Sequence, residues 1–107
     1  MTTIKVQSFR VIHEKDEYFN FLPITVERQS DNKWAIRSSP TNSWNNKYKL
    51  FETDPCRDKV TEDFIRECRY DSIADAIEDA QVASEIRVEK ATKRHREFLE
   101  QKARGLR

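Results

Sequence analysis

Four residues of this sequence could bind a metal ion through nitrogen or sulfur: His13, Cys56, Cys68 and His95. Structural metal sites usually take two ligands from a short C-x₂₋₄-C or H-x₃₋₅-H segment, because that spacing prearranges them. No two of these residues are spaced in that way. We therefore expect no metal and no cofactor, and we expect both cysteines to be reduced thiols.

The residues that could catalyse a reaction are not arranged for it either. No strand–turn–helix elbow places a serine or cysteine for nucleophilic attack. The paired carboxylates, Asp54 with Asp58 and Glu62 with Asp63, fall where capping of loops and helix starts explains them. Gly105 is the only glycine, which excludes the glycine-rich loops that bind nucleotide phosphates. We expect that the protein is not an enzyme.

Charge is distributed unevenly along the chain. Residues 54–85 hold four Lys/Arg and ten Asp/Glu, whereas residues 86–107 hold eight and three, which gives net charges of −6 and +5. The helix dipole explains part of this pattern, because acids suit the start of a helix and bases its end. The rest is a basic row beside an apolar stripe, which suits an acidic protein surface or phosphates. The candidate partner-binding residues are Arg87, Val88, Lys90, Ala91, Arg94, His95 and Phe98.

A second basic surface is expected on the strands. If Trp34, Ile36, Tyr48 and Leu50 face the helix, the opposite face of the sheet carries basic residues. Several nucleic-acid-binding folds grip a strand with basic residues and interleaved aromatics on an open sheet. The solvent face of a one-sided antiparallel sheet is also polar by default, so both interpretations stay open. The candidate nucleic-acid-binding residues are Lys5, Lys33, Arg37, Lys47 and Lys49.

Alternating apolar residues predict strands between residues 4 and 52. The apolar parity slips by one residue between Val6 and Phe9, which indicates a bulge. Pro23 lies inside the apolar run 19–26, so that strand is expected at an edge or kinked. A further strand is predicted over residues 44–51. The short loops between the runs favour an antiparallel meander.

The second part of the chain contains one long predicted helix. Residues 64–70 fit either a helix or a strand, and we favour a short strand there. Ser72 is a good N-cap, and apolar residues then recur at steps of three and four from Ile73 to Phe98. A helix over 72–104 would be about 50 Å long, roughly twice the span of the strands. Its first half is expected to pack on the sheet, and its second half to project, bend back or dimerise.

These observations define one fold class. The 107 residues are expected to form a single α+β domain, with residues 1–70 mainly strands. We predict an antiparallel sheet of four or five strands packed against one long C-terminal helix. No apolar run is long enough to cross a bilayer and residues 1–12 do not read as a signal peptide, so we expect a cytoplasmic protein.

Two functions are compatible with the sequence. The first is a small non-enzymatic protein-binding module, an inhibitor or adaptor, that acts through the basic second half of the helix and can also form a homodimer there. Small, charged, glycine-poor proteins are frequent among phage and mobile-element accessory genes, which agrees with this hypothesis. The alternative is a nucleic-acid-binding protein that uses the basic sheet face and the basic helix row. No motif in these residues identifies a family.

Overall fold

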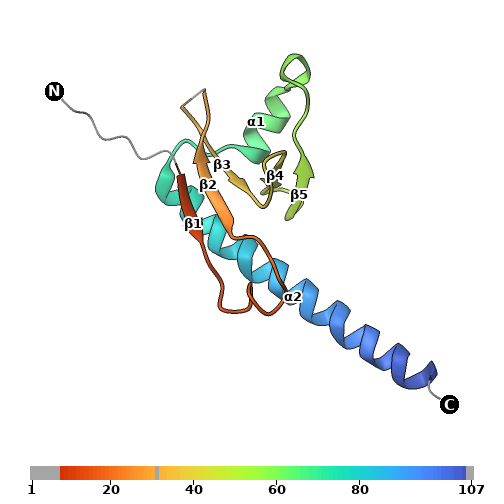
Figure 1. Ribbon diagram of the computed structural model, residues 1–107. Helices are drawn as coiled ribbons and strands as arrows, with labels where there is room; N and C mark the ends of the chain where they lie inside the picture. The colour runs from red at the N-terminus through yellow and green to blue at the C-terminus, as the bar shows by residue number, and fades with distance from the viewer. Residues whose placement is uncertain (1–7, 31, 106–107) are drawn as a thin grey trace.

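The computed structural model describes residues 8–30 and 32–105. It is an α+β fold with five antiparallel strands in two sheets, packed against a long C-terminal helix (Figure 1). The expected fold class is thus confirmed, but the strands form two sheets and not the single sheet that was predicted. The elements are β1 (Ser8–Val11), β2 (Ile24–Arg28), β3 (Trp34–Arg37), β4 (Asn42–Asn45), β5 (Leu50–Thr53), the short 3₁₀ helix η1 (Arg57–Lys59), α1 (Glu62–Cys68) and α2 (Ile73–Gly105).

The first sheet has the strand order β1-β2-β3 and carries much of the core. Phe9 pairs with Val26, and Val26 with Ile36, so the three side chains lie in one row across the sheet. Val26 and Ile36 are fully buried in the cluster that also contains helix residues. The predicted residues Ile4 and Val6, and the bulge after them, lie outside the described residues.

Residues 12–23 connect β1 to β2 and are not a strand. The prediction of a strand over the apolar run 19–26 was wrong in its first half, because β2 begins only at Ile24, after Pro23. Pro23 lacks a backbone N–H and cannot donate within a ladder, which agrees with a strand that starts beyond it. Phe19 and Phe21 therefore lie in a connecting segment, where their rings are free to contact α2.

The predicted strand over residues 44–51 is a hairpin of β4 and β5. Trp44 pairs with Phe51, and their rings meet edge to face with centroids 5.0 Å apart. The turn is built by Asn45, whose Oδ1 accepts the backbone N–H groups of Lys47 and Tyr48, both at 2.9 Å. Asn side chains can close turns in this way without glycine. The condition that Tyr48 faces the helix is not met, since Tyr48 is exposed in the turn.

Residues 62–68 form helix α1, so the strand favoured over 64–70 was wrong and the helical alternative was right. Thr61 is the N-cap, and its Oγ1 accepts the N–H of Phe64 at 3.1 Å. Phe64 and Cys68 stand one turn apart and are both buried. Extended structure begins only after α1, where Tyr70 exchanges two backbone hydrogen bonds with Trp34 at the edge of β3.

Helix α2 confirms the predicted helix over 72–104 almost to the residue. The Oγ of Ser72 accepts the N–H of Asp75 at 3.4 Å, as expected of an N-cap. Its buried residues are Ala76, Ala80, Ala83, Ser84 and Val88, and the small alanines allow the sheet to approach the helix closely. One cluster joins these alanines to Trp44 of the hairpin and to Ile24, Val26 and Ile36 of the first sheet.

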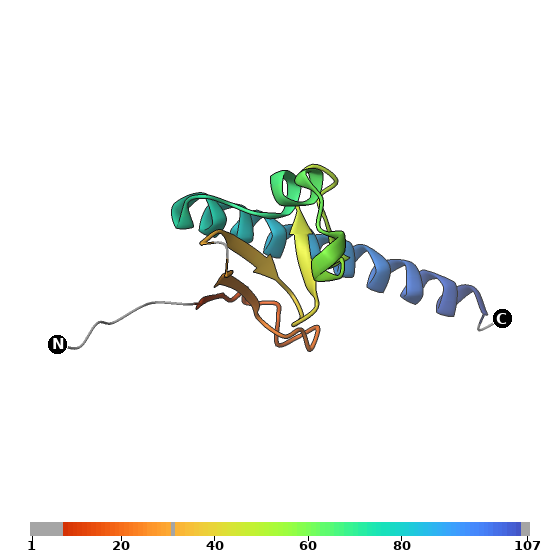
Figure 2. The same ribbon diagram turned by 90° about the horizontal axis from the view of Figure 1, so that it is seen from above.

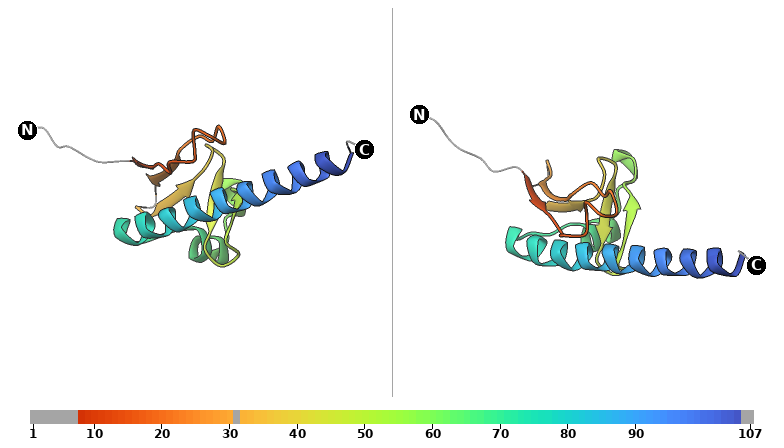
Figure 3. Two further views of the ribbon diagram at one scale, coloured as in Figure 1. Left: turned by 90° about the horizontal axis from the view of Figure 1, so that it is seen from below. Right: turned by 60° about the horizontal axis from the view of Figure 1, so that its bottom comes forward.

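The second half of α2 projects beyond both sheets. Figures 1 and 2 show the strands gathered over the first half of the helix, and both views in Figure 3 show the last turns standing clear of the body. Residues 92–105 are all exposed. A helix of 33 residues is about 50 Å long, more than strands of four or five residues can cover. No helix in the described part of the chain is long and apolar enough to cross a membrane.

Candidate binding groove

Residues 12–23 are fastened to the middle of α2 by polar contacts. His13 Nε2 lies 3.1 Å from a carboxylate oxygen of Glu85, and His13 Nδ1 accepts the N–H of Lys15 at 2.9 Å. Asp16 is 4% exposed and pairs with Arg87 across 3.1 Å. The other carboxylate oxygen of Asp16 accepts the N–H of His13 at 3.0 Å, so one acid both shapes the segment and attaches it to the helix.

Aromatic side chains of the same segment lie against α2. The ring of Phe21 lies 4.3 Å from the guanidinium carbon of Arg87, a cation–π contact. Phe19 packs against Phe21 with centroids 5.5 Å apart, and Tyr18 meets both Phe19 and His95 edge to face. The segment thus presents a line of three aromatic rings along the helix between Arg87 and His95.

A groove of about 380 Å³ lies between this aromatic line, the β4–β5 hairpin and α2. Cavities that bind small ligands or anchor side chains start at about this size. Its walls are mainly aromatic and aliphatic, with basic side chains from the helix. The lining residues are Phe19, Phe21, Trp44, Leu50, Phe51, Ile86, Arg87, Lys90, Ala91 and Arg94.

Positive charge lies beside the groove, and two residues that line it contain buried donors. Lys90 and Arg94 are exposed, and neither makes an ion pair with a described residue. The Nε atoms of Arg87 and of the Trp44 indole are buried and find no hydrogen-bond partner among the described residues. The groove therefore suits an apolar group that carries negative charge beside it.

The seven candidate partner-binding residues of α2 separate into three groups. Arg87, Lys90, Ala91 and Arg94 lie together in the groove, and His95 contacts Tyr18 at its end. Val88 is only 8% exposed and belongs to the core. Phe98 lies one turn beyond Arg94 and is 59% exposed.

Sequence reasoning missed the aromatic half of the groove. Phe19 and Phe21 were assigned to a strand, and Trp44 and Phe51 to a single strand in place of a hairpin. The available signal was Pro23, which argues that the three aromatics before it are not in a strand.

The five candidate nucleic-acid-binding residues do not form one open surface. Arg37 is buried, so the expectation that it lies on a solvent-exposed sheet face was wrong. Lys33 is paired with Asp71, and Lys47 lies 3.6 Å from Glu67. Lys49 is in the hairpin turn and hydrogen-bonds to Asn46, while Lys5 lies outside the described residues.

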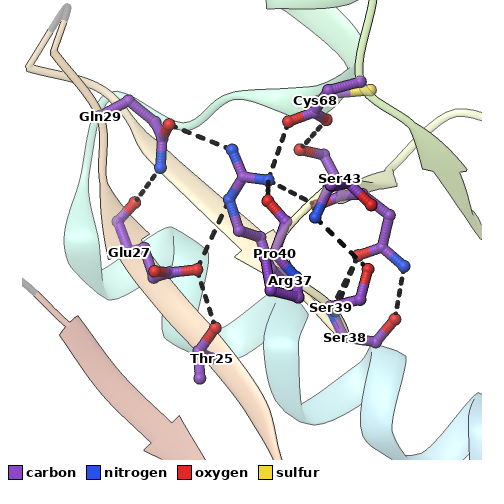
Figure 4. Close-up of polar contacts among 12 residues, drawn as sticks. Thr25, Glu27, Gln29, Arg37, Ser38, Ser39, Pro40, Ser43 and Cys68 are labelled. Atoms are coloured by element: carbon purple, nitrogen blue, oxygen red, sulfur yellow. Dashed lines mark hydrogen bonds and ion pairs between the residues drawn. The ribbon is translucent and has the colours of Figure 1, made fainter.

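Arg37 instead joins the two sheets from within. Its guanidinium donates to the carbonyl oxygens of Pro40 and Asn42 at 3.1 and 3.0 Å, and to Gln29 at 3.2 Å (Figure 4). It also pairs with Asp54 at 2.8 Å. Such a planar, multiply donating group satisfies several acceptors at once, which compensates for burying its charge.

Two further groups that could react, the Cys68 thiol and the Tyr70 hydroxyl, are shielded from solvent. Burial and the nearby carboxylate of Glu52 raise the pKa of the Cys68 thiol to about 12. Burial, together with the carboxylate of Asp79, raises the pKa of the Tyr70 hydroxyl well above its ordinary value. A thiol that stays protonated is a poor nucleophile and a poor metal ligand. Within residues 8–30 and 32–105, no three His, Cys, Asp or Glu side chains are grouped to hold a metal ion.

Comparison with protein-family models and with curated proteins found no match for this chain. No solved structure matches it either.

Proposed function

We propose that the protein is a non-enzymatic binding module whose groove accepts an apolar side chain, flanked by acidic residues, from a partner protein. The observation that carries this proposal is the combination of an aromatic groove with two cations at its rim, Lys90 and Arg94, that pair with no acid among the described residues. The aromatic walls would exclude water from the apolar group, and the cations would select a partner with negative charge next to it.

The projecting half of α2 supports the same proposal. It continues the basic surface beyond the groove, and its exposed residues are not needed to cover the described sheets. Surface cations that face an acidic partner raise the association rate and fix the orientation of binding. An acidic segment could therefore lie along the helix with one apolar side chain in the groove.

A direct test uses a fluorescein-labelled peptide of twelve residues with one central Phe between glutamates. We expect its fluorescence anisotropy to rise on titration with the full chain. Two matched peptides, one with Phe replaced by Ala and one with the glutamates replaced by Lys, should bind at least tenfold more weakly. Equal binding of the Ala peptide would overturn the assignment of an apolar pocket.

Charge-reversed variants locate the site on the protein. Lys90→Glu together with Arg94→Glu should weaken peptide binding at least tenfold. Lys93→Glu together with Arg96→Glu makes the same change in charge on the same helix, at residues that do not line the groove. This control should bind nearly as well as the parent chain, and a similar loss in both variants would mean that only the overall charge matters.

The same titrations should include single- and double-stranded DNA probes at two salt concentrations. The described structure gives no continuous basic sheet face, since Arg37 is buried and Lys33 and Lys47 are paired with acids. We expect weak binding that is insensitive to probe type. Tight binding that falls steeply with salt would favour the nucleic-acid alternative instead.

A further inference from the structure

The chain carries on its own projecting helix the type of residue that the groove would accept. Phe98 is 59% exposed and Leu99 is 50% exposed. Glu97 precedes this pair and Glu100 follows it. Although Arg96 and Lys102 lie just outside the two acids, an exposed aromatic beside Glu97 and Glu100 matches the aromatic walls and basic rim of the groove.

Phe98 cannot enter the groove of its own chain. It lies on the same helix face as Ala91 and Arg94, because the steps between them are seven and four residues. It lies seven residues beyond Ala91 on a continuous helix, which places it about 10 Å further along the axis. A straight helix holds this separation fixed, so only a second molecule can bring a Phe98 side chain to the groove.

We infer that two copies of this chain associate through their projecting helices, with Phe98 of each copy inserted in the groove of the other. The arrangement is antiparallel, since the end of each helix must point back toward the body of its partner. A two-fold axis between the helices makes the two insertions equivalent, as in most homodimers. This inference rests on the groove of the proposed function and names one occupant for it.

The antiparallel arrangement brings both opposite and like charges of α2 together. When Phe98 of one copy is level with Ala91 of the other, Lys102 and Arg104 lie four and six residues beyond that level. The partner's residues at the corresponding positions are Arg87 and Glu85, so Arg104 meets an acid and Lys102 meets a base. Glu97 falls level with residue 92, between the rim residues Lys90 and Arg94, whereas Glu100 falls level with Glu89.

This association would regulate the proposed function. A groove that holds the partner copy's Phe98 is closed to any other protein, so dimerisation and partner binding compete. The competing peptide described above should therefore dissociate the dimer as it binds. Dilution of the protein should increase the fraction of open grooves by mass action.

Sedimentation velocity of the full chain over a range of concentrations tests the dimer. We expect the parent chain to dimerise and Phe98→Ala to weaken the dimer at least tenfold. Val82→Ala removes an exposed apolar side chain from the first half of α2 and should leave association unchanged. A parent chain that remains monomeric at all concentrations, or equal effects of both substitutions, would overturn the inference.

A charge exchange between two chains tests the reciprocal insertion. One chain carries Lys90→Glu and Arg94→Glu in the groove rim, and the other carries Glu97→Lys and Glu100→Lys beside Phe98. Each chain alone should be monomeric, because the groove and the inserted helix end then have the same sign of charge. Their mixture should form a heterodimer, because both of its sites pair opposite charges. No heterodimer in the mixture would contradict reciprocal insertion, and circular dichroism would confirm that both variants fold.

Peptide binding to the Phe98→Ala chain separates this inference from the proposed function. A monomeric parent chain that binds the peptide would refute the dimer and leave the proposed function in place. A parent dimer whose Phe98→Ala variant does not bind the peptide would support the dimer and refute a groove for other proteins.

Discussion

Asp16 and Arg87 are 71 positions apart in the chain and form an ion pair of 3.1 Å between the β1–β2 connection and the middle of α2. Asp16 is almost completely buried, and the side chain of Arg87 is 15% exposed. The pair fixes the connecting segment on the helix and so holds Phe19 and Phe21 in the wall of the groove. Arg87 therefore has a structural role in addition to any contact with a partner.

Replacing Asp16 by Asn should destabilise the fold. The substitution keeps the size of the side chain but leaves the Arg87 guanidinium without its counter-ion, and an unpaired buried charge costs about 3–5 kcal/mol. Urea denaturation followed by fluorescence would measure the loss. The control is Glu85→Gln, which removes the charge of an exposed acid from the His13 contact and should cost less than about 1 kcal/mol. Equal losses in the free energy of unfolding would show that the Asp16–Arg87 pair stabilises the fold no more than the exposed His13–Glu85 contact.

Arg37→Lys should cost about 2 kcal/mol or more, because lysine keeps the charge but lacks the planar set of donors that reaches several acceptors. Arg28→Lys is the matched control, since Arg28 is exposed and, among the described residues, donates to the side chain of Asn32 alone. Chemical denaturation of both variants should separate them by more than 1 kcal/mol. If Arg37→Lys were as stable as Arg28→Lys, the hydrogen bonds drawn in Figure 4 would not contribute to stability.

Two serine-to-alanine substitutions on α2 should act in opposite directions. Ser84 is 3% exposed and its Oγ has no partner among the described residues, so Ser84→Ala should stabilise the protein by about 1 kcal/mol. Ser72 caps the helix, and Ser72→Ala should destabilise it by about 1 kcal/mol. Thermal unfolding of the two variants measures the difference. A loss of stability in Ser84→Ala would indicate that its hydroxyl is satisfied in solution.

Lys49→Gly should stabilise the hairpin by about 0.5–1 kcal/mol, although glycine usually weakens folded structure. Lys49 has a φ of 56°, in the left-handed region where a side chain is unfavourable and glycine is not. Lys47→Gly, two residues earlier in the same turn, is the control and should be destabilising by a similar amount. The prediction fails if both glycine variants lose stability, as judged by their denaturation midpoints.

The two cysteines should differ in reactivity toward a thiol reagent. Cys56 is exposed and should react in the folded protein, whereas Cys68 should react only after denaturation. Burial raises the pKa of Cys68 from 9.0 to about 12, so the folded state binds this proton more tightly than the unfolded state. The resulting stabilisation is complete below pH 9 and is lost as the pH rises toward 12. The parent chain should therefore lose more stability above pH 9 than a Cys68→Ala variant, and equal losses would contradict the shift.

Local sequence signals were sufficient for the long helix and insufficient for the strands. Helix α2 has a capping serine and an apolar stripe over many turns, and both are properties of neighbouring residues. The strand assignments failed where a turn lacked the usual sequence signal. The hairpin turn after Asn45, for example, contains no glycine and is closed by the Asn45 side chain. Helix α1 is only seven residues long, and its pattern also fits a strand until Thr61 is recognised as its cap.

The sequence by itself determined the α+β class, the extent of α2 and the basic row on its second half. Each of these follows from the types of neighbouring residues and the spacing between them. Only the tertiary structure decided which residues share a site. It placed Phe19, Phe21, Trp44 and Phe51 beside the basic row, and it buried Arg37 between the sheets. These outcomes depend on how β1–β2 and β4–β5 dock on the helix, which is fixed by contacts between distant residues such as Asp16 and Arg87. No local pattern encodes such a contact, because neither residue's neighbours indicate its partner.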